Sequence, residues 1–340
     1  MSILLDKLQG KETARPPVWF MRQAGRVLPN YMALRQKYSF KEMMSDPLLC
    51  SKITLLPIED LGVDAAILFS DILVIPEAMG MNLEFTDKGP RFDNALKDRA
   101  LGSISKMETD YSKLDYIYRN IEQIVKDKGD TPLIGFCGAP LTTLCYMVQG
   151  VSSNHTFPEA IKFLYKERDI ARILIDKITE TSVNYALNQI KSGVQVFQLF
   201  ESHAGLIPSD LYNELFLPGI KRIAEAVRAT GTPFIFFPKG LGTGLGDMDT
   251  SMADFVSIDW QMSLAKARKI VAPEIGLQGN LDPRLLYSNK ENIAEELKKY
   301  HKFYEKDKNF IFNLGHGLLP DIPVDNVKFV VDQIKSHDWK

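Results

Sequence analysis

Two arginines near the start of the chain have the residue type and the spacing of an anion receptor. Arg22 and Arg26 follow the apolar run Val18–Met21, and the residues between them are Gln23, Ala24 and Gly25. The planar guanidinium group binds carboxylate or phosphate through paired hydrogen bonds and stays charged at any working pH. Surface ion pairs are the alternative interpretation, but the glycine and proline residues of 17–31 favour a shaped loop, where binding residues often lie. The stretch predicts a site for an anionic ligand.

A second candidate group is a carboxylate in an apolar setting. Asp71 follows the apolar run Ala65–Phe69 and precedes another apolar run at 72–74. Burying a carboxylate among apolar side chains is unfavourable unless the carboxylate is paired. A helix N-cap or an arginine partner is one interpretation of Asp71. The other is a carboxylate aimed at N–H groups or at a positive charge that develops during a reaction.

Two histidines lie in short stretches that contain glycine. His203 is part of ESHAG and His316 is part of NLGHG. Each is a candidate ligand contact, and a hydrogen-bonded turn residue is the alternative for either one. Glycine on both sides of His316 favours a backbone shaped around a ligand. Neither histidine has the spacing of a zinc site, so we predict no metal.

Other familiar motifs fail when they are tested against the sequence. The run KGLGTGLG at 239–246 matches neither the dinucleotide pattern nor the nucleoside-triphosphate pattern, so we interpret it as a mobile loop, although Lys239 could still meet an anion. No G-x-S-x-G elbow is present, and Ser202 has no base at a recognisable spacing other than the adjacent His203. Covalent catalysis is not indicated.

Composition narrows the functional class. The chain has 340 residues, of which 45% are hydrophobic and 25% charged, and a formal net charge of -2, so nothing attracts it globally to nucleic acid or to anionic membranes. Cys50, Cys137 and Cys145 are in no metal-ligand spacing and favour a reducing, cytoplasmic compartment. No secretory signal and no apolar stretch of membrane-spanning length is recognisable.

The elements that must position these residues alternate along the chain. Eight short apolar runs are predicted as buried parallel strands: Val18–Met21, Ala65–Phe69, Leu133–Phe136, Val194–Phe200, Phe234–Phe237, Val256–Ile258, Ile275–Leu277 and Phe310–Phe312. Helical patterns fill most of the gaps: Pro47–Leu61, Tyr111–Lys128, Pro158–Lys191, Pro208–Ala229, Ser263–Val271, Lys290–Lys308 and Pro323–His337. This order predicts an α/β protein with a closed (β/α)8 barrel, and a doubly wound open sheet is the alternative. We predict one domain over residues 1–340, with an insertion at Asp87–Met107.

Polar residues and glycines follow each predicted strand. Besides the arginines they include Ser70-Asp71, Cys137 to Pro140, Glu201 to His203, Pro238 to Gly240, Asp259-Trp260, Gln278 to Asn280 and Asn313 to His316. The carboxyl ends of all barrel strands lie on one rim, where barrel enzymes build their active sites. We therefore expect a single active-site cleft at the C-terminal rim.

Taken together, these motifs resemble those of the uroporphyrinogen decarboxylases, over nearly the whole chain. The similar stretches are PVWFMRQAGR at 17–26, GAPLTTLCYMVQG at 138–150, FESHAG at 200–205, LQGNLDP at 277–283 and NLGHG at 313–317. The chain departs from the family pattern at Leu141, where an aromatic residue is more usual, and just after Gly150. Neither difference touches a matched polar position.

The resemblance implies a (β/α)8 barrel, a homodimer, and an enzyme that uses neither cofactor nor metal. The implied substrate is a cyclic tetrapyrrole with four acetate and four propionate arms, and each acetate loses carbon dioxide to leave a methyl group. The resemblance also implies roles for individual residues. Arg22 to Arg26 would be the carboxylate-binding loop, Asp71 the pyrrole-binding carboxylate, and Tyr146, Ser202 and His316 the other substrate contacts.

The chemistry of decarboxylation suits these residue types. Protonation of a pyrrole ring creates a cationic electron sink, which Asp71 would stabilise, while Arg22 and Tyr146 act near the reacting acetate. Three proton donors stay open: Arg22, which holds its own proton tightly, a bound water, and a carboxyl of the substrate. Two other functions also stay open. One is a zinc-dependent barrel methyltransferase and the other is a tetrapyrrole-binding protein without catalysis.

Overall fold

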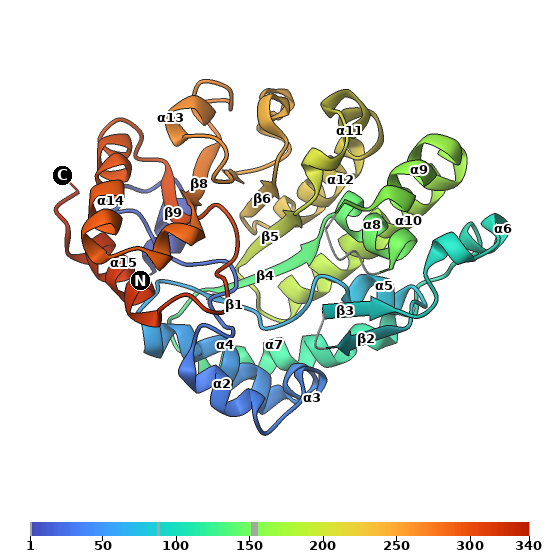
Figure 1. Cartoon of the computed structure of the whole chain (residues 1–340), viewed down its shortest axis with the longest axis horizontal. Helices are drawn as coiled ribbons and strands as arrows, with labels where there is room; N and C mark the ends of the chain where they lie inside the picture. Colours follow the sequence, from blue (N-terminus) through green and yellow to red (C-terminus); the bar gives the residue numbers. More distant parts are fainter. Residues whose placement is uncertain (1, 87–88, 151–155, 340) are drawn as a thin grey trace.

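A curled parallel sheet of seven strands forms the centre of the structure, a computed structural model that describes residues 2–86, 89–150 and 156–339 (Figure 1). The spatial order β1-β4-β5-β6-β7-β8-β9 follows the chain, as expected for repeated βαβ units. Its strands are β1 Ala66–Ile67, β4 Leu133–Gly138, β5 Val196–Glu201, β6 Phe234–Pro238, β7 Phe255–Ser257, β8 Gly276–Leu281 and β9 Phe310–Leu314. The predicted α/β class is confirmed.

The predicted first strand, Val18–Met21, is wrong as a strand. Val18 forms only an isolated parallel bridge with Phe312. Beyond it, the backbone N–H of Phe20 donates to the Gln23 side chain over 2.9 Å, and that of Met21 donates to the Asn313 side chain over 3.2 Å. Side-chain oxygens thus accept from the backbone N–H groups that would pair with a neighbouring strand in a sheet. An eight-stranded barrel is therefore not confirmed, and the described sheet has seven strands.

Residues 17–19 nevertheless lie between the two edges of the sheet. The Phe312 N–H donates to the Pro17 carbonyl over 2.8 Å, and the Trp19 N–H donates to the Phe312 carbonyl over 3.4 Å. On the other side, the Asp64 N–H, just before β1, donates to the Val18 carbonyl over 2.8 Å. The start of the chain thereby joins β9 to the beginning of β1.

Helices surround the curled sheet (Figure 1). The α-helices are α1 Ile3–Leu8, α2 Pro29–Arg35, α3 Phe40–Ser45, α4 Pro47–Leu61, α5 Val74–Ala78, α6 Leu101–Ile104, α7 Asp115–Asp127, α8 Pro140–Gln149, α9 Pro158–Lys166, α10 Arg168–Lys191, α11 Ser209–Leu215, α12 Leu217–Arg228, α13 Leu264–Ala267, α14 Lys290–Tyr304 and α15 Val324–Ser336. Short 3-10 helices are η1 Leu96–Asp98, η2 Tyr111–Leu114, η3 Ala204–Leu206, η4 Gly242–Asp247 and η5 Pro283–Tyr287. Two predicted helices are each split in two, at Glu167 and at Phe216. The prediction missed six helices that the structure describes: α1, α2, α3, α5, α6 and α8.

The predicted insertion contains part of a small hairpin. β2 Leu83–Thr86 pairs antiparallel with β3 Gly89–Phe92, and η1 and α6 follow. Residues 87–88, at the start of the predicted insertion, lie outside the described residues. The hairpin forms a second sheet that is separate from the central one.

A buried polar network crosses the inside of the curl. Gln278 of β8 donates to Gln198 of β5 over 3.1 Å and is also bonded to Ser257 of β7. The indole N–H of Trp19 donates to Gln278 over 3.0 Å. Two strands separate β5 from β8 in the sheet, so this contact shows how strongly the sheet curls. Since buried amides need partners, the network holds the four segments in register.

Asp64 anchors the start of the chain to β1. Its carboxylate accepts from two guanidinium nitrogens of Arg15, over 2.6 and 2.8 Å, and from the Val18 N–H over 2.8 Å. The carboxylate is only 8% exposed. Removing it would leave a mostly buried guanidinium and a backbone donor without their partner.

We expect Asp64→Ala to lower the free energy of unfolding by about 2–3 kcal/mol, because both partners lose their acceptor. Urea denaturation measures this change. Glu295→Ala is the control, since it removes a carboxylate that is 72% exposed and pairs with Lys298, and it should cost less than about 0.5 kcal/mol. Equal losses in the two variants would contradict an anchoring role for Asp64.

Candidate active site

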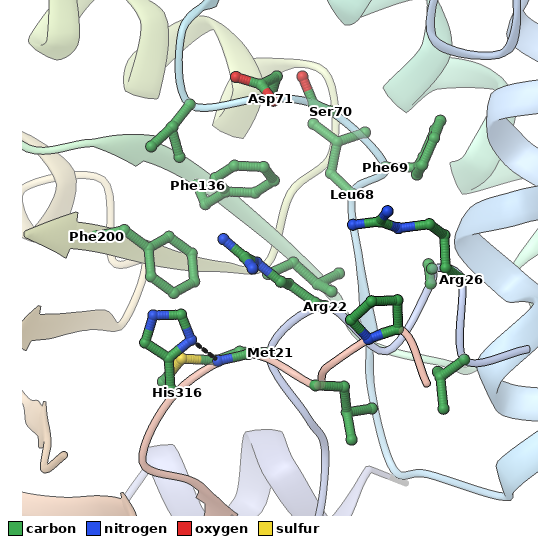
Figure 2. A pocket seen from close by; sticks show the side chains of 18 of the residues that line it. Met21, Arg22, Arg26, Leu68, Phe69, Ser70, Asp71, Phe136, Phe200 and His316 are labelled. Carbon is green, nitrogen blue, oxygen red and sulfur yellow. Dashed lines mark hydrogen bonds between the residues drawn. The ribbon is translucent and has the colours of Figure 1, made fainter. Parts of the chain in front are cut away.

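A cleft of about 420 Å³ opens among the C-terminal ends of the strands. Most of the predicted site residues line it: Arg22, Ala24, Gly25, Arg26, Asp71, Ser202 and His316. Figure 2 shows Asp71 and Ser70 at one end of the view, His316 at the other, and Arg22 between them. The predicted residues are therefore brought together from the ends of β1, β5 and β9 and from the loop that follows Val18–Met21.

Aromatic side chains form much of the rest of the wall. Phe136, Phe200 and Phe237 come from β4, β5 and β6 and also line the cleft. Phe200 lies between the other two rings, with centroid distances of 5.6 Å to Phe136 and 6.1 Å to Phe237. From the sequence, these three residues are predicted only as parts of strands. An aromatic residue near the end of each of three neighbouring strands was the signal that could have identified this wall.

The arginine loop begins with a tight turn. The Gln23 N–H donates to the Phe20 carbonyl over 3.1 Å, which closes a β-turn with Arg22 at its third position. Arg22 has φ 62°, a left-handed conformation that costs a side-chain-bearing residue about 1 kcal/mol. This backbone geometry directs the Arg22 side chain into the cleft, and Gly317 allows it to pass, because a Cβ there would lie 2.4 Å from the Arg22 Cδ.

Gln23 supports this loop from behind and does not line the cleft. Its side chain is fully buried, accepts from the Phe20 N–H over 2.9 Å, and donates to the Ala65 carbonyl over 2.8 Å. The amide thus joins the turn to the segment that enters β1. Its predicted contact with substrate stays a prediction, and the geometry gives Gln23 a positioning role.

Neither loop arginine is neutralised by the described protein. Arg22 and Arg26 are exposed towards the cleft, and no ion pair is found for either within residues 2–86, 89–150 and 156–339. Two unpaired guanidinium groups in one cleft favour the binding of an anionic ligand.

Asp71 is a carboxylate in a poorly solvated position. Its Oδ1 accepts from the Leu73 N–H over 2.8 Å, in the local turn that follows β1. Burial raises the pKa of Asp71 above its ordinary value, while the Leu73 N–H and the Arg22 guanidinium oppose this shift. Asp71 does not cap a helix, because the N-cap of α5 is Leu73, and no ion pair joins Asp71 to an arginine among the described residues. Its carboxylate lines the cleft, and its role in a reaction stays a prediction.

His316 is held as a neutral hydrogen-bond donor. Its Nδ1 accepts from the Gly317 N–H over 2.7 Å, as the dashed line in Figure 2 shows, so the proton of the neutral ring is on Nε2. Burial, Arg22 and Lys239 lower the pKa of His316 to about 3. His316 can therefore donate to a ligand carboxylate without adding a charge.

Tyr146 is half-buried and is not among the residues that line the cleft. It is on α8, where its ring packs 5.0 Å from Phe157 and 5.8 Å from His203. Burial and the Asp71 carboxylate raise the pKa of Tyr146 to about 12, so its hydroxyl keeps its proton. Tyr146 is thus electrostatically coupled to Asp71, and its predicted contact with substrate stays a prediction.

Glu201 is a buried carboxylate whose role the sequence analysis missed. It accepts from the Leu141 N–H over 3.1 Å, from the Thr142 N–H over 2.7 Å and from the Thr142 hydroxyl over 2.5 Å. These backbone donors are in the first turn of α8, whose N-cap residue, Ala139, has no side chain to cap them. Glu201 therefore caps from β5 the helix that carries Tyr146. No capping motif in the sequence could reveal this, because Glu201 is 59 residues from Thr142 along the chain.

The chain is similar along its whole length to one family of known proteins. A family model described as uroporphyrinogen decarboxylase (URO-D) matches residues 1–337. The chain belongs to the uroporphyrinogen decarboxylase family. It is 40% identical over 331 residues to the uroporphyrinogen decarboxylase of Trichlorobacter lovleyi, with 96% of each chain covered. It is also 40% identical to that of Christiangramia forsetii over 337 residues, with 98% of each covered. The family resemblance is confirmed.

Solved structures share the fold at low sequence identity. A methyltransferase from Methanosarcina mazei matches with a TM-score of 0.76 and 21% identity, covering 98% of this chain and 97% of that one. A B12-independent methionine synthase from a Shewanella species matches with a TM-score of 0.53 and 12% identity, covering 88% and 90%. At these identities the likeness concerns the fold alone.

Two kinds of feature are absent from the described residues. No helix among them is long and apolar enough to cross a membrane. Nor do these described residues contain a group of three or more His, Cys, Asp or Glu side chains that could hold a metal ion.

The titration of Glu201 gives a testable pH dependence. Burial raises the pKa of Glu201 to about 7, against the hydrogen bonds that favour the carboxylate. Between its unfolded pKa, near 4.5, and about pH 7, the folded protein holds a proton that the unfolded chain has released. The free energy of unfolding of the wild type should therefore rise, relative to Glu201→Gln, as the pH is lowered from about 8 to about 5.

Urea denaturation of both proteins across this range measures the difference, and subtraction removes groups that titrate equally in both. The variant should also be less stable at every pH, because its amide group would face the N–H donors of α8. A difference that does not change with pH would contradict the shifted titration of Glu201.

Proposed function

We propose that this chain removes the four acetate carboxyl groups of uroporphyrinogen to give coproporphyrinogen and carbon dioxide, as a carboxy-lyase of tetrapyrrole biosynthesis. The observation that carries the proposal is one half-buried carboxylate, Asp71, in a cleft walled by aromatic rings and unpaired arginines. A ring with N–H groups at its centre and carboxylates around it is complementary to that arrangement. Membership of the family supports the same reaction.

Charge stabilisation by Asp71 is the central step. Protonation of a pyrrole ring carbon gives a cationic ring that can accept the electron pair of the breaking bond when the adjacent acetate loses carbon dioxide. The exocyclic carbon then takes up a proton to become a methyl group, and the ring loses its extra proton. A carboxylate under the pyrrole N–H groups lowers the energy of the cation, and its effect is large because the site is poorly solvated.

The arms of the substrate bind to the groups around Asp71. Arg22 and Arg26 hold carboxylates through paired hydrogen bonds, and His316 donates from Nε2 as a neutral partner. Ser202, just after β5, offers a hydroxyl on the same wall. Tyr146, with its proton retained, donates towards the reacting acetate. This division leaves the negative charge of Asp71 for the ring alone.

The proton that starts the reaction has three candidate sources: Arg22, a bound water and a carboxyl of the substrate. Guanidinium groups hold their protons strongly. Arg22 is exposed and no carboxylate in the described chain pairs with it, so it can orient an ionised carboxylate arm of the substrate. A carboxyl arm that donates the proton must lie away from Arg22, because a guanidinium group lowers the pKa of a carboxyl beside it. The neutral state of His316 makes it a donor of hydrogen bonds rather than an acid.

We also propose the finer points of organisation that the family resemblance implies. These are a single domain over 1–340, a (β/α)8 barrel that residues 17–19 close in place of an eighth strand, a homodimer, a cytoplasmic location, and catalysis without cofactor or metal. The hydrogen bonds of Pro17, Val18 and Trp19 support the closure. Sedimentation measures the oligomeric state.

The reaction is tested by anaerobic incubation with reduced uroporphyrinogen and by counting the carboxyl groups lost by chromatography. We expect turnover by the wild type and a loss of about 10²–10³-fold in Asp71→Asn, because the neutral amide cannot stabilise the cation. Asp210→Asn, an exposed change in the first turn of α11, is the control and should leave turnover unchanged. No loss of carboxyl groups by the wild type would refute the reaction, and it would favour a binding protein without catalysis.

Arg22→Lys tests the paired hydrogen bonds of the loop. We expect KM to rise about tenfold, since an ammonium group cannot bind a carboxylate through two parallel N–H donors and about 1.5 kcal/mol is lost. Steady-state kinetics with the same substrate measure it. Arg172→Lys, on α10 and paired with Glu214, is the control. If KM and kcat are both unchanged in Arg22→Lys, Arg22 does not contact the substrate.

A further inference from the structure

A lysine on the side of the rim away from Asp71 has no partner in the proposed mechanism. Lys239 directly follows β6, which lies three strands along the sheet from β1, or about 14 Å at the usual strand spacing. Its side chain is half-buried. Burial and the repulsion of Arg22 lower the pKa of Lys239, while Asp259 opposes them. The protein therefore holds a partly desolvated cation within electrostatic reach of the cleft.

The nearby carboxylate of Asp259 is already occupied by the backbone. Asp259 accepts from the Gly240 N–H over 2.6 Å and from the Gln261 N–H over 2.8 Å. It forms no ion pair with Lys239, and none is found between Lys239 and any other carboxylate of residues 2–86, 89–150 and 156–339. Lys239 thus resembles Arg22 and Arg26 in having a charge that the described protein does not neutralise.

Trp260 connects this lysine to the cleft. The Lys239 ammonium lies 5.4 Å from the centre of the Trp260 ring, and the ring meets His316 edge-on at 5.8 Å. His316 itself lines the cleft. Arg284 also lies over Trp260, at 5.3 Å, but its guanidinium is paired with Asp282 over 2.7 Å. Of these two cations on the indole, Lys239 is the one left for an external anion.

The backbone that carries Lys239 is held firmly. Its N–H donates to the Glu201 carbonyl over 3.0 Å, and its carbonyl accepts from the Gly205 N–H over 3.1 Å. Gly205 packs so closely on Gly240 that an added Cβ would lie 2.6 Å from the Gly240 carbonyl oxygen. The backbone that carries the cation is therefore already fixed, and only the freedom of the side chain is lost when it binds a ligand.

We propose that Lys239 and Trp260 form a further carboxylate-binding position, which holds a propionate arm of the substrate on the side of the ring remote from the reacting acetate. This inference rests on the proposed function. The ammonium binds the carboxylate, and the indole covers the apolar carbons of the arm. Because propionates are retained through all four decarboxylations, the position serves every round equally.

Lys239→Met tests the proposal, since methionine keeps an unbranched apolar stem against Trp260 and removes the charge. We expect KM for uroporphyrinogen to rise about tenfold, with kcat changed less than about twofold, as for loss of one charge-assisted hydrogen bond away from the reacting bond. Inhibition by coproporphyrinogen, which has propionates and no acetates, should weaken by the same factor. Lys239→Arg should retain most of the binding.

Lys290→Met is the matched control, because Lys290 also lies over an aromatic ring, Phe329 at 5.5 Å, but on α14 and outside the cleft. It should change neither constant. Unchanged KM in Lys239→Met overturns the proposal, as does a fall in kcat alone. A higher KM with unchanged product inhibition overturns the assignment to propionate.

Equilibrium dialysis with coproporphyrinogen under anaerobic conditions separates this proposal from the proposed function. It measures binding without requiring turnover. If the wild type binds the product but decarboxylates nothing, the proposed reaction fails while the comparison with Lys239→Met still decides the role of the lysine. Equal binding by the two proteins overturns the proposal whatever the activity.

Discussion

The site depends on where the first extended segment stops being a strand. Had the N–H groups of Phe20 and Met21 joined a sheet ladder, the chain would have continued straight past the rim. The side chains of Gln23 and Asn313 accept from those N–H groups instead, so the chain turns at Arg22. Arg22 has a left-handed backbone conformation in this turn. The cost of that conformation, about 1 kcal/mol, is offset by the hydrogen bonds that these two buried amides make. One local exchange of hydrogen-bond partners thus aims the arginine loop at the cleft.

A second consequence is electrostatic. The overall charge of -2 conceals a region in and beside the cleft where Arg22, Arg26 and Lys239 gather and His316 is driven to its neutral form. Such an arrangement is less stable when empty and is relieved by a ligand with several carboxylates. Asp71 alone is of opposite sign among the charged groups described here as lining the cleft. In the proposed function, this pattern of one anion and several cations is complementary to a ring with N–H groups inside and acidic arms outside.

Sequence reasoning predicted most of the fold, and it predicted most of the residues that line the cleft, because both rest on local patterns. Continuous apolar runs predicted seven strands that are present, and α4 has the predicted bounds. The prediction failed where the local structure depends on hydrogen-bond partners that are distant along the chain. Val18–Met21 does not form a strand, because Asn313, 292 residues away along the chain, accepts from the Met21 N–H. The first turn of α8 is capped by Glu201 rather than by its own neighbour. The polar residues after each strand were located by topology alone, whereas the roles of Gln23 and Glu201 required coordinates.

Gln23 and Glu201 show that residues beside the cleft can act through the backbone they hold. Each lies beside a cleft residue, Arg22 in one case and Ser202 in the other, yet each is fully buried and bonded to backbone groups. Burying Glu201 lowers the stability of the fold, because its carboxylate is desolvated and no cation contributes to its titration. A hydrophobic residue there would remove that cost but would leave the first turn of α8 uncapped. The helix that carries Tyr146 is therefore kept in place at the expense of stability, a common compromise at a site that must be rigid.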